Sequence, residues 1–260
     1  MNKVTVITGA SSGIGAALAR QLGSKGHHLV LAARREDELN RVAKDTGTKT
    51  LVVKADVTSR HDVEHICDLA LQEFGHVDVW VNNAGRGITK PVMELTDREV
   101  DEIVAVVLKS VLYGAQTIIP HFQERGQGHL INVSSFLGRV PLASYRSIYS
   151  AAKAGVNVLT ANLRMDLKTR YPGIHVSLVM PGVVDTEFHK VASTPSFVGP
   201  GGRTGRVTIQ SAEEVASQIA LLIEHPVAEL YTNPSSAGMV QQYYQDVDRF
   251  EENMATQKPP

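Results

Sequence analysis

The sequence predicts a single-domain α/β protein with a doubly wound, parallel β-sheet of about seven strands and helices on both faces of the sheet. Short apolar runs rich in Val, Ile and Leu recur along the chain, as expected of strands that are buried on both sides. Each run is followed by a longer segment in which apolar residues recur at helical spacing. Strands that alternate with helices in this way favour a parallel sheet over an antiparallel one.

Six runs are predicted to be strands because they are apolar, short and bounded by turn-forming residues. They are Val4–Thr8, Leu29–Ala33, Thr50–Lys54, Val77–Val81, Leu130–Ser134 and Ile174–Val179. The second half of the chain adds two long helical stretches, residues 97–125 and 148–170, which we expect on one face of the sheet, where two subunits could meet. Ser211, with Glu214 three residues later, forms a capping-box pattern that predicts a helix over residues 212–224.

The domain organisation follows from where this periodicity stops. The length of 260 residues and the hydrophobic content of 43% suit one large core, which we expect to span residues 1–232. Between about 183 and 210 the periodicity disappears among Gly, Pro and Ser residues, so we predict a mobile loop that covers the substrate. Residues 233–260 are predicted to form an extension with an amphipathic helix and a disordered end.

Composition excludes several classes of function. The 26 Lys and Arg residues nearly balance the 27 Asp and Glu residues, so no basic field is available for nucleic acid. No signal peptide or membrane span is expected, and the single cysteine, Cys67, suits a reducing compartment, which predicts a cytoplasmic protein. His61 and His65 are four residues apart but lack a third ligand, so no metal site is predicted.

A glycine-rich segment follows the first strand and precedes a helix-forming run. Its residues are Gly9, Ser11, Ser12, Gly13, Ile14 and Gly15. Glycines at such a turn let backbone N–H groups approach a pyrophosphate, whose negative charge then lies at the positive end of the following helix. The spacing Gly-x-x-x-Gly-x-Gly differs from the commoner Gly-x-Gly-x-x-Gly of Rossmann folds, and a turn that binds nothing is the alternative.

The end of the second strand points to the form of the cofactor. Proteins that bind NAD place an acidic residue there to hold the ribose hydroxyls, whereas this chain has Arg34 and Arg35. An arginine can bind a 2′-phosphate through charge-assisted hydrogen bonds, so Arg34 first and Arg35 second favour NADP(H). The alternative is that both arginines are solvated charges at the start of a helix.

Four further motifs occur in order along the chain: Asn82-Asn83-Ala84-Gly85, Ser134-Ser135, Tyr149-x-x-x-Lys153 and Pro181-Gly182. Together with the glycine-rich segment they resemble the short-chain dehydrogenase/reductase family, and the resemblance covers Val4 to about Tyr231. It implies a Rossmann-type fold and hydride transfer between a nicotinamide cofactor and a carbonyl or alcohol.

The resemblance also implies roles for individual residues. Asn83, Ala84 and Gly85 would contact the cofactor at its ribose and nicotinamide end, and Asp56 with Val57 would contact the adenine. The nicotinamide carboxamide would be bordered by Pro181, Gly182, Val183 and Thr186.

The chemistry is expected at Tyr149, Lys153 and Ser135. Tyr149 and Lys153 lie one helical turn apart, so the lysine charge is expected to lower the pKa of the phenol and make it a useful acid or base. The resemblance implies that Lys153 also holds the nicotinamide ribose and that Ser135 holds the substrate oxygen, with Ser134 as the competing serine.

The expected substrate is a small carbonyl compound or alcohol, and a hydrophobic one. Apolar and aromatic residues near the expected nicotinamide site would form its pocket. They are Phe136, Leu137, Leu142, Tyr145, Val184 and Phe188. Alternatively, several of these residues simply pack the loop onto the body of the protein.

The protein is expected to assemble as a homodimer or a homotetramer.

One position departs from the family pattern. Many members carry an asparagine that helps to hold a water linked to the catalytic lysine, and this chain has Val107 there. A valine side chain cannot form hydrogen bonds, although Ser110 lies about one turn further on. Two alternatives therefore stay open: an NADP(H)-binding scaffold or sensor with weak catalysis, and an epimerase or dehydratase that uses the same Tyr and Lys.

Overall fold

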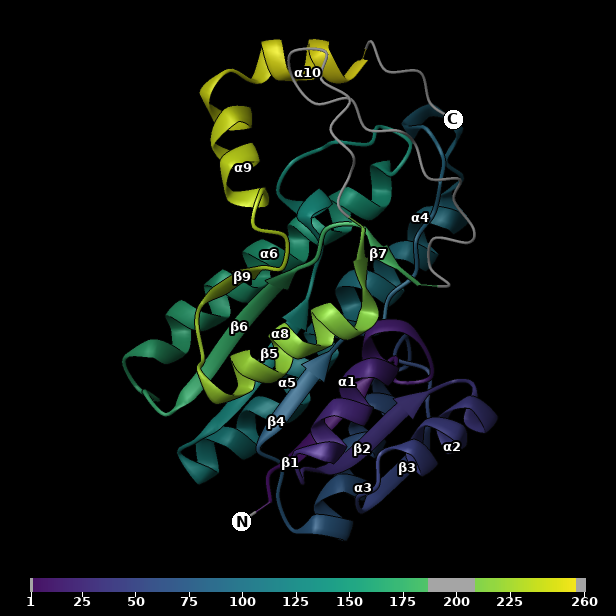
Figure 1. Ribbon diagram of the computed structural model, residues 1–260, viewed down its shortest axis with the longest axis vertical. Coiled ribbons are helices and arrows are strands. Elements are labelled where there is room, and N and C mark those ends of the chain that lie inside the picture. The colour runs from purple at the N-terminus through teal and green to yellow at the C-terminus, as the bar shows by residue number, and fades with distance from the viewer. Residues whose placement is uncertain (1, 187–208, 256–260) are drawn as a thin grey trace.

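A seven-stranded sheet forms the centre of the structure, a computed structural model that describes residues 2–186 and 209–255 (Figure 1). All neighbouring strands are parallel, in the order β3-β2-β1-β4-β5-β6-β9. The strands are β1 (Val4–Thr8), β2 (His28–Ala33), β3 (Thr50–Lys54), β4 (Val79–Asn82), β5 (Gly128–Val133), β6 (Ile174–Met180) and β9 (Glu229–Tyr231). The predicted fold class is confirmed, and the strand order reverses between β1 and β4, where α/β proteins of this type hold their ligands.

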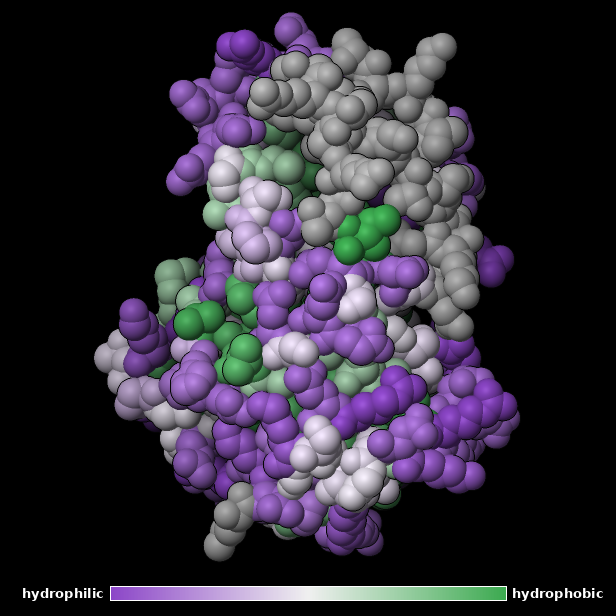
Figure 2. Space-filling view, in the orientation of Figure 1, coloured by the Kyte–Doolittle hydropathy of each residue, from purple (hydrophilic) through white to green (hydrophobic). Residues whose placement is uncertain are grey.

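Helices cover both faces of this sheet, as the alternating pattern predicted (Figure 1). On one face, α1 (Gly13–Ser24), α2 (Glu36–Asp45) and α8 (Ala212–Glu224) share a buried apolar cluster with the strands. On the other, α3 (Arg60–Phe74), α5 (Ser110–Arg125) and α6 (Ser147–Lys168) share a second cluster. Figure 2 shows the outside of the face with α1 and α8 as mostly hydrophilic, with apolar residues only in small, separate spots.

Local signals begin and end several helices. The predicted capping box at α8 is confirmed, because the Ser211 hydroxyl accepts from the Glu214 N–H and the Glu214 carboxylate accepts from the Ser211 N–H. Thr96 and Glu99 form a second capping box at the start of α4 (Asp97–Val104). Gly75 ends α3 in the left-handed conformation that glycine adopts most easily.

The stretch predicted as one long helix over residues 97–125 contains an interruption. Between α4 and α5 lies a π-helical turn, η2 (Ala105–Lys109), with Val107 fully buried inside it. By length and composition alone this stretch could cross a membrane, which qualifies the expectation that no such segment exists. In the structure, Ile118, Ile119 and Phe122 of α5 are instead buried in the cluster shared with the sheet and α3.

The C-terminal tail forms two helices, α9 (Ser236–Gln245) and α10 (Val247–Ala255), where one was expected. They pack onto the body through an apolar cluster that includes Phe250 of α10 and Phe136 of the 3-10 turn η3 (Phe136–Gly138). This turn directly follows Ser135, so the tail contacts the segment that carries a predicted catalytic residue.

Gly114 in α5 lies against the side chain of Asn82, at the end of β4. The Asn82 carboxamide accepts from Trp80 and donates to Asn132, and a Cβ on residue 114 would overlap it. We expect Gly114→Ala to lower the free energy of unfolding by about 1–3 kcal/mol through overpacking. Denaturant titration would measure this change.

Gly238 provides the matched control for this substitution. A Cβ there would meet nothing within 4 Å, and the residue lies in α9, so Gly238→Ala should leave stability unchanged or raise it slightly. Equal free energies of unfolding for the two variants would contradict the assigned contact.

Candidate functional site

A cleft of about 1170 Å³ lies at the carboxyl ends of the central strands. It gathers most of the residues predicted to bind the cofactor: Gly9, Ser11, Ser12, Gly13, Ile14, Arg34, Arg35, Asp56, Val57, Asn83, Ala84, Gly85, Tyr149, Lys153, Pro181, Gly182 and Thr186. Gly15 and Val183 lie behind this wall. A Cβ on Gly15 would overlap the Gly9 carbonyl, and the Val183 carbonyl accepts from the Gln210 N–H beside β7 (Val184–Asp185) and β8 (Gln210–Ser211).

The glycine-rich loop has the shape and the open donors that a pyrophosphate needs. Gly9 has φ +66°, and a Cβ there would come within 2.7 Å of Ala84 Cα, so a larger residue would fill the cradle. Helix α1 begins at Gly13, and its first turn contains no acidic residue. The N-cap, Ser12, makes no side-chain hydrogen bond to the helix, so the first N–H groups of α1 remain available to an anion.

Arg35 holds a positive charge directly against this loop. Its guanidinium donates from Nη2 to Ser12 Oγ at 2.6 Å and to Ser11 Oγ at 3.2 Å. Arg34 also lines the cleft, beside the end of β2. The sequence ranked Arg34 first, whereas the structure gives Arg35 the contacts to the loop, and the two arginines together form a basic end of the cleft.

The Asn83 turn joins the loop to the next strand. The Asn83 side chain donates to the carbonyls of Thr8 and Gly9, and the N–H groups of Asn83 and Ala84 both donate to the Thr8 hydroxyl. Thr8 is fully enclosed and was not singled out from the sequence. These bonds fix the two ends of the cradle to each other, which keeps the cleft wall in one shape.

Asp56 and Val57 follow β3 at the rim of the same cleft. Asp56 accepts from the N–H and the hydroxyl of Thr58, and its own N–H donates to Asp62. The carboxylate is therefore held in a fixed turn at the rim of the cleft that Arg34 and Arg35 also line.

Tyr149, Lys153 and Ser135 meet at the centre of the cleft. All three side chains are buried, and they come from α6 and from the segment after β5. The Tyr149 phenol forms a hydrogen bond with Ser135, and Lys153 Nζ lies 5.8 Å from the centroid of the Tyr149 ring. Lys153 Nζ also donates to the Val133 carbonyl at 2.8 Å.

The protonation states differ from those expected from sequence spacing. Burial raises the pKa of Tyr149, and the hydrogen bond from Ser135 and the charge of Arg146 only partly oppose this. Burial also lowers the pKa of Lys153 to about 8. The expected lowering of the Tyr149 pKa by Lys153 is therefore not found, because burial dominates the shift and the cation that opposes it is Arg146.

The two adjacent serines point in different directions. The Ser134 hydroxyl donates to Asn157 Oδ1 at 2.6 Å and is occupied with α6. The Ser135 hydroxyl instead accepts from the Leu137 N–H and faces Tyr149. The geometry therefore favours Ser135 over Ser134 as the hydroxyl beside the reacting group.

Val107 lies in η2 and belongs to an apolar cluster with Ile103 and Val156. Its side chain is fully enclosed, so no water bonded to that side chain can exist. Ser110, considered as a substitute, donates its hydroxyl proton to the Val106 carbonyl at 2.8 Å. Neither residue reproduces the asparagine of the family pattern.

The predicted substrate residues separate into two groups. Val184 lines the cleft, whereas Phe136 and Leu142 belong to the cluster under the tail helices and Leu137 packs beside α6. Tyr145 is absent from the described wall, and its backbone carbonyl accepts from the Lys90 N–H. Phe188, like residues 187–208 of the expected loop, lies outside the described residues.

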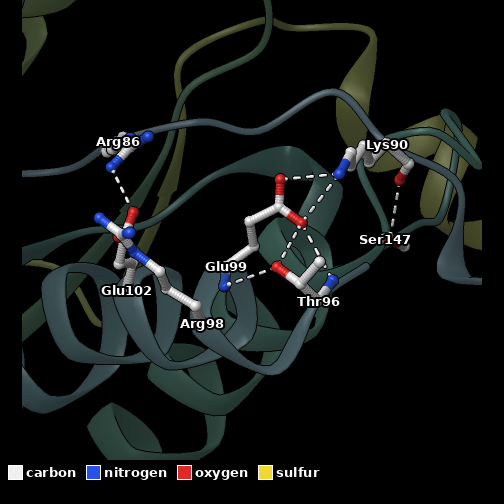
Figure 3. A network of polar contacts seen from close by, with 7 residues as sticks. All are labelled: Arg86, Lys90, Thr96, Arg98, Glu99, Glu102 and Ser147. Atoms are coloured by element: carbon white, nitrogen blue, oxygen red, sulfur yellow. Dashed lines mark hydrogen bonds and ion pairs between the residues drawn. The ribbon is translucent and has the colours of Figure 1, made fainter. Parts of the chain in front are cut away.

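The described wall is more charged than the sequence predicted. The loop after Gly85 and the start of α4 contribute Arg86, Lys90, Glu99 and Glu102. Lys90 pairs with Glu99 at 2.8 Å and Arg86 pairs with Glu102 at 2.8 Å, and both carboxylates have lowered pKa values because of the hydrogen bonds they accept (Figure 3). Sequence patterns did not predict these charged residues at the cleft, because the position of the loop after Gly85 depends on contacts between segments that are distant in the sequence.

Arg146 is the remaining charged residue of the described wall that was not identified from the sequence. It precedes Tyr149 by three residues, so the helical spacing could have identified it. Among the described residues, no group of three His, Cys, Asp or Glu side chains is placed to hold a metal ion.

The chain is similar to known proteins over most of its length. Residues 3–195 match the model of the short chain dehydrogenase family. An uncharacterized oxidoreductase of Staphylococcus epidermidis is 35% identical over 184 residues, which covers 71% of this chain and 79% of the relative.

Two solved structures show the same fold with different cofactors. A short-chain dehydrogenase/reductase from Burkholderia phymatum, in complex with NAD, has a TM-score of 0.85 at 26% identity and covers 100% of this chain and 96% of its own. An alcohol dehydrogenase from Thermococcus sibiricus, complexed with 5-hydroxy-NADP, has a TM-score of 0.75 at 29% identity. The match covers 89% of this chain and 96% of the alcohol dehydrogenase.

Proposed function

Because this chain belongs to the short-chain dehydrogenase family and is an oxidoreductase of that family, we propose that it uses NADP(H) to interconvert a carbonyl compound and an alcohol. The observation that carries this proposal is the buried meeting of Ser135, Tyr149 and Lys153 in the cleft that the glycine-rich loop borders. Arg35 against Ser11 and Ser12, with no acidic residue at the end of β2, favours the 2′-phosphorylated cofactor.

The cleft offers a complementary group for each part of the cofactor. The first turn of α1 and the glycine-rich loop would hold the pyrophosphate, Arg34 and Arg35 the 2′-phosphate, and Asp56 with Val57 the adenine. Asn83, Ala84 and Gly85 would hold the ribose together with Lys153, and the nicotinamide would lie beside Pro181, Gly182, Val183 and Thr186. When bound, NADPH supplies the hydride.

The residues of the chain supply the proton and the orientation. In the proposed reduction, Ser135 donates a hydrogen bond to the substrate oxygen and Tyr149 transfers its phenolic proton to that oxygen. The raised pKa of Tyr149 keeps it protonated at neutral pH, which suits reduction better than oxidation. Lys153 stays beside the phenol, and its position is fixed by the Val133 carbonyl.

The described cleft wall gives little support for a strictly hydrophobic substrate. Of the six residues predicted for its pocket, only Val184 lies in the described wall, next to the charged rim. The proposal therefore covers aldehydes, ketones and diketones that carry polar groups as well as apolar ones.

The first test is a rate measurement. Purified protein mixed with NADPH and a panel of aldehydes, ketones and diketones should oxidise NADPH, followed as loss of absorbance, and should use NADH less efficiently. Tight NADPH binding without turnover would instead support the scaffold or sensor that Val107 suggests. Conversion of a substrate without net consumption of cofactor would support the epimerase or dehydratase.

The remaining proposals concern the assembly and its location. We propose a homodimer or homotetramer in the cytoplasm, with the face of α6 as a contact, because Val158 and Met165 are exposed there. We also propose that residues 1–232 form the catalytic domain and that residues 233–260 form its extension. Sedimentation that shows only a monomer would contradict the oligomer.

A further inference from the structure

A second cation, Arg146, lines the same cleft wall as Tyr149. Arg146 is the N-cap of α6, three residues before Tyr149, so the two side chains leave neighbouring positions on the same side of the helix. Both residues line the cleft together with Ser135. Only 6% of Arg146 is exposed, which is unusual for an arginine.

Contacts with the loop after β4 fix the position of Arg146. Its Nη1 donates to the Ile88 carbonyl at 3.3 Å. On either side, the Lys90 N–H donates to the Tyr145 carbonyl and the Ser147 hydroxyl donates to the Lys90 carbonyl, the second of which is visible in Figure 3. The ion pair between Lys90 and Glu99 then ties this loop to α4.

The two cations near Tyr149 differ in how they respond to pH. Lys153 has a pKa lowered to about 8 by burial, so it loses its charge in mildly alkaline solution. A guanidinium keeps its charge throughout the accessible pH range. In a buried site such a charge is screened much less than it would be at the surface.

We propose that Arg146 is a positioning residue for Tyr149, whose permanent positive charge at the cleft wall favours the deprotonated phenol and so eases proton transfer from it. This proposal rests on the proposed function only in assuming that the Tyr149 proton is transferred to the substrate. The charge of Arg146 is among the causes that hold down the raised pKa of Tyr149.

Among the described residues, the other titratable groups that line the cleft near Tyr149 do not take over this role. Across the cleft, Lys90 and Arg86 are each paired with a carboxylate, so their charges are largely balanced. Tyr145 is neutral, with a pKa raised by burial. Lys153 directs its ammonium to the Val133 carbonyl.

The decisive experiment measures ionisation of Tyr149 without turnover. Tyrosinate absorbance is recorded in the cofactor-free protein, and the signal of a Tyr149→Phe variant is subtracted. At a fixed alkaline pH that lies below the native midpoint and at which circular dichroism shows a folded chain, Arg146→Gln should reduce the ionised fraction about tenfold, equivalent to a midpoint about one pH unit higher. Arg146→Lys, which retains a cation, should recover at least part of that fraction below the pKa of the new lysine.

Two further variants make the outcome decisive. Arg86→Gln removes an exposed cation from the same wall and should leave the ionised fraction of Tyr149 nearly unchanged. Arg146→Met replaces Arg146→Gln if the latter does not fold. An ionised fraction equal to that of the native chain in the folded Arg146 variant would overturn the proposal, as would an equal loss in Arg86→Gln.

The pH profile of kcat/KM links the effect to the reaction. In alcohol oxidation, the acidic limb should move upward in Arg146→Gln by the same amount as the tyrosinate signal. Full turnover in Tyr149→Phe would refute the proposed function while leaving the tyrosinate result to decide the role of Arg146.

Discussion

Tyr149→Phe should lower kcat for carbonyl reduction by about 100- to 10,000-fold, the usual contribution of general acid catalysis. The substitution removes only the phenolic oxygen, which forms the hydrogen bond with Ser135, and keeps the ring that packs with Ala152 and Val156. Because the phenol is buried in the cleft wall, no water replaces its proton at the same position without rearrangement. Steady-state loss of NADPH absorbance with the best substrate of the panel measures the effect.

The control must separate lost chemistry from lost structure. Tyr113→Phe removes a phenolic oxygen from α5, where the ring stacks under Arg60 at 4.4 Å outside the cleft, and should keep native rates. The Kd for NADPH, measured by nucleotide fluorescence, should change less than kcat in Tyr149→Phe. Retention of more than about a tenth of native kcat would argue against Tyr149 as the proton donor.

The strands and the glycine-rich loop could be predicted because their signals are local. Short runs rich in Val, Leu and Ile mark the buried strand β1 and the partly buried edge strand β3, and both were predicted with the bounds that the structure gives. The seventh strand, β9, is three residues long and half-exposed, and it carries too little apolar sequence to be recognised. The π-turn η2 was missed since Ala105–Lys109 has the same apolar pattern as an α-helix.

The chemistry of the cleft was harder to predict because burial depends on the whole fold. The four-residue spacing of Tyr149 and Lys153 correctly placed both on one helix beside the cleft. It could not indicate that the site would be enclosed deeply enough to raise the pKa of one group and lower that of the other. The three-residue spacing from Tyr149 could have indicated that Arg146 lies on the same side of the helix, but its burial in the cleft wall depends on the loop that contains Ile88.

Arg35→Ala should lower kcat/KM for NADPH by about 10- to 100-fold and leave kcat/KM for NADH almost unchanged. A hydrogen bond to a charged group contributes about 1.5–3 kcal/mol, and the guanidinium already lies against Ser11 and Ser12 of the glycine-rich loop. The loss should therefore depend on the 2′-phosphate, which is the only difference between the two cofactors. Initial rates with each cofactor at a saturating concentration of the same carbonyl substrate give the ratio.

Two further substitutions test which cation carries this preference. Arg34→Ala should have the smaller effect. Both arginines carry the same charge and line the cleft, but Arg35 is the one that contacts the glycine-rich loop. Lys54→Ala removes an exposed cation at the end of the adjacent strand, paired in register with Ala33, and should not change the ratio of the two cofactors. If NADH and NADPH lose efficiency equally in Arg35→Ala, the arginine supports the shape of the loop and the 2′-phosphate is not its ligand.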